Sequence, residues 1–143
     1  MSPWVSLTYE LGTGSMATYD GSDMIGTQAI TEWTRLVLDG LPDSAIPYID
    51  PLKVPERWWD GIAQVVADHR VLVTVGGAEC LKDDIVRFGQ RMCEVHPGAR
   101  MVLQEFGVHE DPFLDFMWGK EGQRKVGAVT PLIVGWLADG WQD

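Results

Sequence analysis

The feature that most constrains this chain is a short run of aliphatic and β-branched residues, Val71–Val75 (VLVTV), which ends in Gly76-Gly77. The run carries no charge and lacks the regular apolar–polar alternation of a strand with one wet face. It therefore predicts a strand that is buried on both faces. Strands of this kind belong to parallel sheets covered by helices, so an α/β fold is expected.

The segment that follows completes a strand, helix, strand unit. Residues 81–94 predict a helix because Ile85, Phe88 and Met92 recur on one face. Met101–Phe106 (MVLQEF) predicts a second strand, which leaves through a glycine. Two such strands joined by a helix form a βαβ unit and run parallel.

Two further segments show helical spacing. The apolar positions from Thr27 onward repeat as in an amphipathic helix until Gly40 ends the run. Residues 124–138 predict a helix near the end of the chain, in which Thr130-Pro131 either produces a kink or restarts the helix.

The remaining segments predict irregular backbone. Residues 1–26 are rich in Gly, Ser, Thr and Met and show no sustained period. Residues 42–59 contain four prolines and predict mostly extended or turn backbone, with one helical turn from Pro55 through Trp59.

The charge balance narrows the possible partners. The 143 residues contain 11 Lys and Arg against 21 Asp and Glu, a formal net charge of −10 at pH 7. Nucleic acids and anionic membrane surfaces require a basic footprint, so neither is an expected partner. No apolar stretch reaches the roughly 20 residues of a membrane span, and the amino terminus lacks the pattern of a signal peptide. The sequence predicts a soluble, cytoplasmic protein.

The two cysteines, Cys80 and Cys93, do not form a disulfide framework. On a helix between them they would lie about 20 Å apart, beyond the reach of a disulfide. We interpret both as small apolar packing residues. The carboxylate of Glu79 beside Cys80 raises a thiol pKa, which argues against Cys80 as a nucleophile.

The three histidines, His69, His96 and His109, form no pair four residues apart and lie near no CxxC motif. The sequence therefore predicts no metal site, and no cofactor is expected.

A carboxylate and an imidazole follow the two predicted strands. The first strand leads into Gly76–Glu79 and the second into Gly107–His109. The carboxyl ends of parallel strands share one edge of a sheet, and neighbouring strands lie about 4.8 Å apart. Glu79 is then able to accept a hydrogen bond from one ring nitrogen of His109, which leaves the other nitrogen as a general base. Asp111, two residues after His109, is a rival acid.

These motifs resemble the carboxy-terminal part of the hormone-sensitive-lipase-like α/β-hydrolases. Members of that family carry an acid-x-Leu-x-Asp-acid motif after the penultimate strand and a Gly-x-His motif after the last. The corresponding residues here are Glu79–Asp84 (ECLKDD) and Gly107–His109. Ser2–Trp4 also resembles the segment before the cap helices of that family. The resemblance covers nearly the whole chain and is strongest over residues 50–113.

The resemblance implies roles for individual residues. Glu79 corresponds to the triad acid, which is usually Asp in this family, and His109 to the triad base. Asp83 and Asp84 cap or charge the start of the helix that follows.

The resemblance also implies the carboxy-terminal half of an α/β-hydrolase fold: a partial parallel sheet with flanking helices and a remnant cap segment. We expect one partial domain over residues 1–143. Residues 1–60 are its cap-like and connecting segment, and residues 61–143 are its βαβα unit. Two strands alone leave unpaired edges, so the fold is expected to be incomplete without a partner.

The family's nucleophile motif G-x-S-x-G and its HGGG-type oxyanion loop are both absent from the sequence. The nearest string is Gly12–Met16 (GTGSM), but its serine does not have glycines two residues before and two residues after it. The expected partner is therefore an amino-terminal hydrolase half, or further copies of this chain.

The expected substrate is a small hydrophobic ester or related metabolite. The candidates for the walls of its pocket are Trp58, Trp59, Val108 and Trp118.

Three functions remain open on the sequence. The chain supplies Glu79 and His109 to a serine ester hydrolase whose nucleophile lies elsewhere. Alternatively, a homo-oligomer uses the same pair for acid–base isomerisation or cyclisation. The third possibility is a non-catalytic binding or assembly protein derived from a hydrolase.

Overall fold

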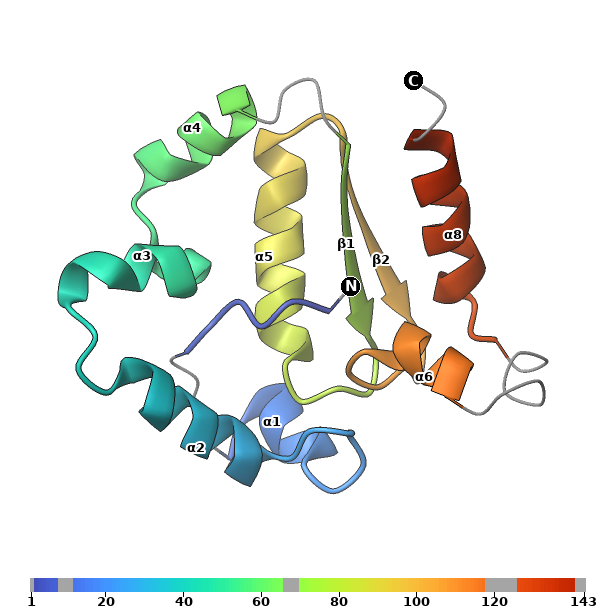
Figure 1. Cartoon of the computed structure of the whole chain (residues 1–143), viewed down its shortest axis with the longest axis horizontal. Coiled ribbons are helices and arrows are strands. Elements are labelled where there is room, and N and C mark those ends of the chain that lie inside the picture. Colours follow the sequence, from blue (N-terminus) through green and yellow to red (C-terminus); the bar gives the residue numbers. More distant parts are fainter. Residues whose placement is uncertain (1, 8–11, 66–69, 118–125, 141–143) are drawn as a thin grey trace.

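The computed structural model describes residues 2–7, 12–65, 70–117 and 126–140 of the chain. Helices surround a small parallel sheet (Figure 1). In chain order, the elements are α1 (Gly14–Tyr19), α2 (Thr27–Leu38), η1 (Asp43–Ala45), α3 (Ile46–Ile49), η2 (Pro51–Lys53), α4 (Glu56–Val65), β1 (Val71–Gly76), α5 (Lys82–Val95), β2 (Ala99–Gln104), α6 (Asp111–Met117) and α8 (Val129–Gly140). The predicted mixed α/β class is confirmed, whereas the incompleteness of the fold stays a prediction.

The two strands pair in parallel, and α5 connects them. The register runs from Val71 opposite Ala99 to Gly76 opposite Gln104. The last four residues of β1 are buried, as expected, whereas β2 is only partly covered and exposes Leu103. The predicted βαβ unit is therefore confirmed.

The second strand begins and ends two residues earlier than expected, and it stops at Gln104. The carbonyl of Gln104 accepts the N–H of Gly77 at 2.8 Å and the N–H of Gly107 at 3.0 Å. The second of these bonds closes a turn. Phe106, inside that turn, has a left-handed backbone with φ of 61°, which a strand does not accommodate.

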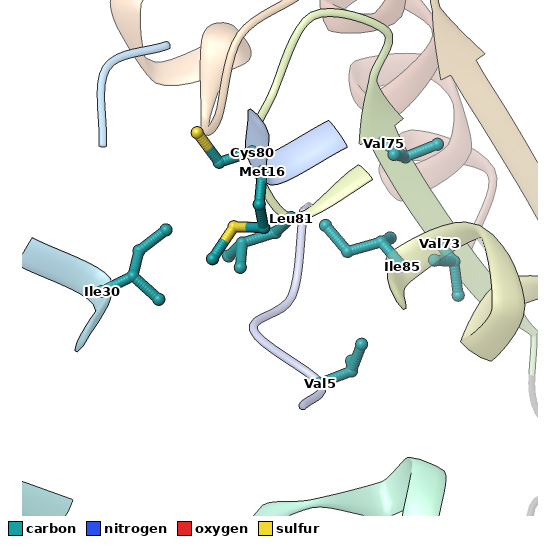
Figure 2. Close-up of a cluster of buried hydrophobic side chains, with 8 residues drawn as sticks. All are labelled: Val5, Met16, Ile30, Val73, Val75, Cys80, Leu81 and Ile85. Carbon is teal, nitrogen blue, oxygen red and sulfur yellow. The ribbon is translucent and has the colours of Figure 1, made fainter. Parts of the chain in front are cut away.

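The core lies between α5 and the sheet and reaches the amino-terminal segment. Ile85 of α5 is fully buried in one cluster with side chains from β1, α1 and α2, which converge in Figure 2. The members are Val5, Met16, Ile30, Val73, Val75, Cys80, Leu81 and Ile85. Burial of one such aliphatic side chain contributes about 1.5–3 kcal/mol. The amino-terminal helices are thus fixed to the βαβ unit by a shared core.

The expectation of irregular backbone over residues 1–26 is wrong at α1. Gly14 begins this helix with φ of 53°, a conformation that suits glycine. The carboxylate of Asp83 in α5 accepts the N–H of Ser15 at 2.8 Å. The helix start is therefore stabilised by a contact 68 residues away, which local sequence patterns do not reveal.

The proline-rich segment is more helical than expected. It forms the short turns η1, α3 and η2, with Pro47 and Pro51 in first turns, where a missing N–H costs no hydrogen bond. The helical turn expected at Pro55 is also longer, because α4 extends from Glu56 to Val65.

The two other predicted helices are present with adjusted ends. The helix expected from Thr27 to Gly40 ends at Leu38. The last helix begins at Val129, so Thr130-Pro131 lies in its first turn, close to the helix start that the restart alternative expected there. Arg124, where this helix was expected to begin, lies outside the described residues.

A glycine at the end of β1 permits the approach of the loop that follows β2. A Cβ atom on Gly76 would lie 2.5 Å from the carbonyl oxygen of Gly107 and 2.8 Å from that of Val108. Gly135, in the middle of α8, has no atom within 4 Å of the corresponding position. The two positions form a matched pair for substitution by alanine.

We expect Gly76→Ala to destabilise the chain by about 1–3 kcal/mol, because two backbone carbonyls must move. Gly135→Ala should instead stabilise it by up to about 1 kcal/mol, the gain in helix propensity. Urea denaturation followed by circular dichroism measures both changes. Equal stabilities of the two variants would contradict the close approach at Gly76.

Candidate active site

Two loops leave the sheet at the same edge. Gly77–Glu79 follows β1 and Gly107–His109 follows β2, and the arrowheads of both strands point to this edge in Figure 1. The N–H of Ala78 donates to the carbonyl of Gly107 at 2.8 Å, which joins the loops directly. The parallel pairing therefore delivers the two side chains singled out in the sequence to one place.

Glu79 and His109 form a buried hydrogen-bonded pair. The Oε2 atom of Glu79 lies 3.0 Å from Nδ1 of His109. The other carboxylate oxygen, Oε1, accepts the N–H of Gly76 at 3.1 Å. Glu79 is 0% exposed and His109 is 8% exposed. A carboxylate only accepts, so Nδ1 carries the proton and Nε2 is left as the basic nitrogen.

The pKa of His109 lies above its ordinary value of 6.5. Burial is the largest single influence and acts to lower this pKa. It is outweighed by the hydrogen bond to Glu79 and by the negative charges of Glu79, Glu110 and Asp23. The surroundings therefore favour the protonated imidazole more than water does.

The rival acid Asp111 is engaged elsewhere. Its carboxylate accepts a hydrogen bond from the side-chain amide of Gln104. Burial, followed by the charge of Asp115, raises the pKa of Asp111 despite that bond. The oxygen of the same Gln104 amide accepts the N–H of Val129 at 3.2 Å, so this group ties α6 and α8 to the end of β2.

Asp23, in the connection between α1 and α2, also contacts both loops, and sequence reasoning missed it. Its carboxylate accepts the main-chain N–H groups of Cys80 and His109. These residues lie 57 and 86 positions away along the chain. No periodicity or motif in the sequence carries a signal for contacts at such separations.

The remaining acids of the ECLKDD motif have structural partners. Asp83 accepts the N–H of Ser15 and so caps α1, and it makes no cap hydrogen bond to α5. Asp84 is paired with Arg87 one turn further along α5. Both acids nevertheless lie in the first turn of α5, where negative charge is favourable.

Ser15, the serine of the GTGSM string, is held in the interface between α1 and α5. Its hydroxyl donates to the carbonyl of Cys80 at 2.7 Å and accepts the N–H of Asp83 at 3.2 Å. The side chain is buried and engaged in structure. This structural role agrees with the sequence, in which Ser15 lacks the G-x-S-x-G spacing of a nucleophile.

The two cysteines occupy different surroundings. Cys80 belongs to the core, and burial, followed by the charge of Asp23, raises the pKa of its thiol to about 12. It is therefore a packing residue, as expected. Cys93 lies exposed on α5, so the packing role predicted for it is wrong.

The expected pocket wall of Trp58, Trp59, Val108 and Trp118 stays a prediction. The ring of Trp58 packs edge-on against that of Tyr48, with 5.0 Å between the ring centroids. Trp59 is buried against Phe88 of α5, with 5.7 Å between the ring centroids. Val108 lines a cavity of about 10 Å³ at the end of the strands. That volume has room for about one water molecule, not for an ester. Trp118 lies outside the described residues.

The described ranges contain neither a metal-binding cluster nor a membrane-spanning helix. In residues 2–7, 12–65, 70–117 and 126–140, no group of three or more His, Cys, Asp or Glu residues is placed to hold a metal ion. Within the same ranges, no helix combines the length and apolarity needed to cross a membrane.

The raised pKa of His109 makes stability depend on pH. A histidine whose pKa rises on folding contributes stability that is fully present below about pH 6.5 and is lost as the pH rises through its folded-state pKa. Between about pH 5.5 and about pH 8.5, we expect the free energy of unfolding to fall more steeply in the wild type than in His109→Asn. Urea denaturation across this range tests the difference, and parallel pH curves would exclude it.

The cysteine environments predict selective alkylation. Iodoacetamide at about pH 8 should modify Cys93 and spare Cys80 in the folded chain, because only a thiolate reacts readily. Both should react in urea, which serves as the control. Mass spectrometry of the peptides measures the two extents, and equal modification of the folded chain would contradict the burial of Cys80.

A family model described as steryl acetyl hydrolase matches residues 1–132. No curated protein and no solved structure matches the chain. The family match supports a lipase- or esterase-like hydrolase relationship, and the narrower resemblance to hormone-sensitive lipases stays a prediction. This chain belongs to the steryl acetyl hydrolase family.

Proposed function

We propose that this chain supplies the acid, Glu79, and the base, His109, of the catalytic triad of a serine ester hydrolase. The observation that carries the proposal is the 3.0 Å hydrogen bond between Glu79 Oε2 and His109 Nδ1, at the carboxyl edge of a parallel sheet in a member of a hydrolase family. Acid and base of such triads are held in this way on several unrelated folds.

The pair is arranged for general base catalysis. Glu79 keeps the proton on Nδ1 of His109, so Nε2 takes the proton from the attacking serine hydroxyl. The imidazolium that forms lies against the buried carboxylate, which stabilises its charge. Nε2 then returns the proton to the leaving alcohol, and the acyl-enzyme is hydrolysed by water in a second cycle.

The proposal requires a nucleophile from residues other than these 143. None of the 143 residues forms a G-x-S-x-G motif, and no HGGG-type loop is present. The serine and the oxyanion hole are therefore assigned to an amino-terminal hydrolase half, whether on the same polypeptide or on a partner. The hydroxyl of Ser15 is bound to Cys80 and Asp83, which supports leaving it out of this role.

The proposed substrate is a hydrophobic ester. The family is described by its action on steryl acetates, so an acetate ester of a sterol is the first choice. Large apolar side chains flank His109 in the chain and are exposed: Phe106 by 81%, Phe113 by 54% and Phe116 by 55%. Such a surface supports contact with an apolar ligand or with the rest of a hydrolase fold.

The experiment combines this chain with an amino-terminal segment of a family member that carries G-x-S-x-G and the oxyanion loop. We expect the mixture to hydrolyse an acetate ester and its serine to react with a serine-directed phosphonate. Glu79→Gln should lower kcat by about 10⁴-fold and His109→Ala by about 10⁶-fold, the usual costs of removing the acid and the base of a triad.

Asp111→Asn is the matched control, because Asp111 is the other acid near the histidine and is bound to Gln104. It should keep most of the activity. Full activity of His109→Ala in the mixture would falsify the proposal. Turnover that depends on Glu79 and His109 without any added serine would favour the acid–base alternative.

A further inference from the structure

Asp23 lies between the loops that carry Glu79 and His109. Its Oδ1 accepts the main-chain N–H of His109 at 2.9 Å, and its Oδ2 accepts that of Cys80 at 2.7 Å. The residue belongs to the connection between α1 and α2, which Figure 1 shows near the carboxyl ends of the strands. The Asp23 carboxylate, which comes from a third part of the chain, thus links Cys80, the residue after Glu79, to His109.

The hydrogen bond from the N–H of His109 to Asp23 lies next to a residue with an unfavourable backbone conformation. Glu110, the next residue, has a left-handed conformation with φ of 56°, which disfavours residues with a side chain. A backbone of this kind persists where surrounding contacts determine it. Asp23 provides such a contact one residue earlier, at the N–H of His109.

The local geometry of Asp23 is itself fixed. Its Oδ1 also accepts the N–H of Met24 at 2.7 Å, so the carboxylate is held within its own turn. It then contacts the two loops through main-chain N–H groups.

We propose that Asp23 is a positioning residue, which fixes the main chain of His109 relative to Glu79 so that the imidazole keeps its hydrogen bond to the carboxylate. The inference rests on the proposed function of the pair. It assigns part of the triad geometry to the connection between the two amino-terminal helices.

Asp23 also acts on the imidazole through its charge. Burial is the largest single influence on the pKa of His109 and acts to lower it, but the hydrogen bond to Glu79 and the charges of Glu79, Glu110 and Asp23 together outweigh burial and raise this pKa. Removal of the charge at Asp23 lowers the pKa of His109. A purely structural residue at this position would leave that pKa unchanged as long as the chain folds.

The test measures the pKa of His109 by NMR titration of its imidazole in the full chain. In Asp23→Asn, we expect the pKa to shift downward and the Nδ1–H proton signal to weaken or move upfield, because the hydrogen bond to Glu79 loosens. An unchanged pKa and an unchanged Nδ1–H signal in the folded variant would overturn the proposal.

Asp20→Asn is the matched control. Asp20 lies three residues earlier in the same connection, and its Oδ1 accepts the N–H and the hydroxyl of Thr27. The substitution removes the same charge from the same segment without touching either loop. It should leave the pKa of His109 unchanged, and a shift equal to that of Asp23→Asn would also overturn the proposal.

A measurement on the wild type covers the case in which Asp23→Asn does not fold. The amide protons of Cys80 and His109 should both exchange slowly and lose protection at the same concentration of denaturant, because one carboxylate holds both. We call the joint hold of Asp23 on the N–H groups of Cys80 and His109 the clamp, and exchange of either amide at the rate of an unstructured peptide would contradict it.

These readouts do not require ester hydrolysis, so they separate the two proposals. A lowered pKa in Asp23→Asn together with an inactive reconstituted mixture would retain the clamp and reject the hydrolase role. In an active mixture, Asp23→Asn should lower kcat with little change in KM. It should also shift the acidic limb of the profile of kcat against pH to lower pH. An unchanged pH profile would reject the clamp alone.

Discussion

The parallel pairing of β1 with β2 is the interaction on which the rest of the structure depends. The register places Gly76 opposite Gln104, so both strands end at the same level and release their loops side by side. Main-chain bonds from Gly77 and Ala78 to the second strand and its loop continue the ladder beyond the sheet. The absence of a Cβ atom at Gly76 lets the carbonyls of the second loop approach closely. A shift of one residue in this register would separate the carboxylate from the imidazole.

The burial of Glu79 imposes the second constraint. A fully buried carboxylate is costly unless its oxygens accept hydrogen bonds and a partner offsets its charge. Here one oxygen accepts the N–H of Gly76 and the other contacts His109. The acid is therefore stable in this position only when the histidine loop is in place, and Asp23 binds that loop through His109. Strand pairing, acid, base and the α1–α2 connection form one interdependent unit.

The parts of the structure that the sequence predicts are those with local causes. The β-branched run of β1 and the amphipathic face of α5 depend on near neighbours, and the rule that parallel strands end at one edge then brings Glu79 and His109 together. The errors have distant causes. Helix α1 depends on Asp83 of α5, and β2 ends early because the carbonyl of Gln104 closes a turn. The exposure of Cys93 and the contacts of Asp23 likewise depend on how segments pack.

The hydrogen bonds of Asp23 have a consequence for the order in which the chain folds. They close loops of 57 and 86 residues, and contacts of such long range form against a larger loss of chain entropy than local ones. The βαβ unit needs only the residues from Val71 to Gln104. We infer that strands and crossover helix assemble first and that the α1–α2 connection docks afterwards. A chain caught between these stages has a native sheet but no aligned Glu79–His109 pair.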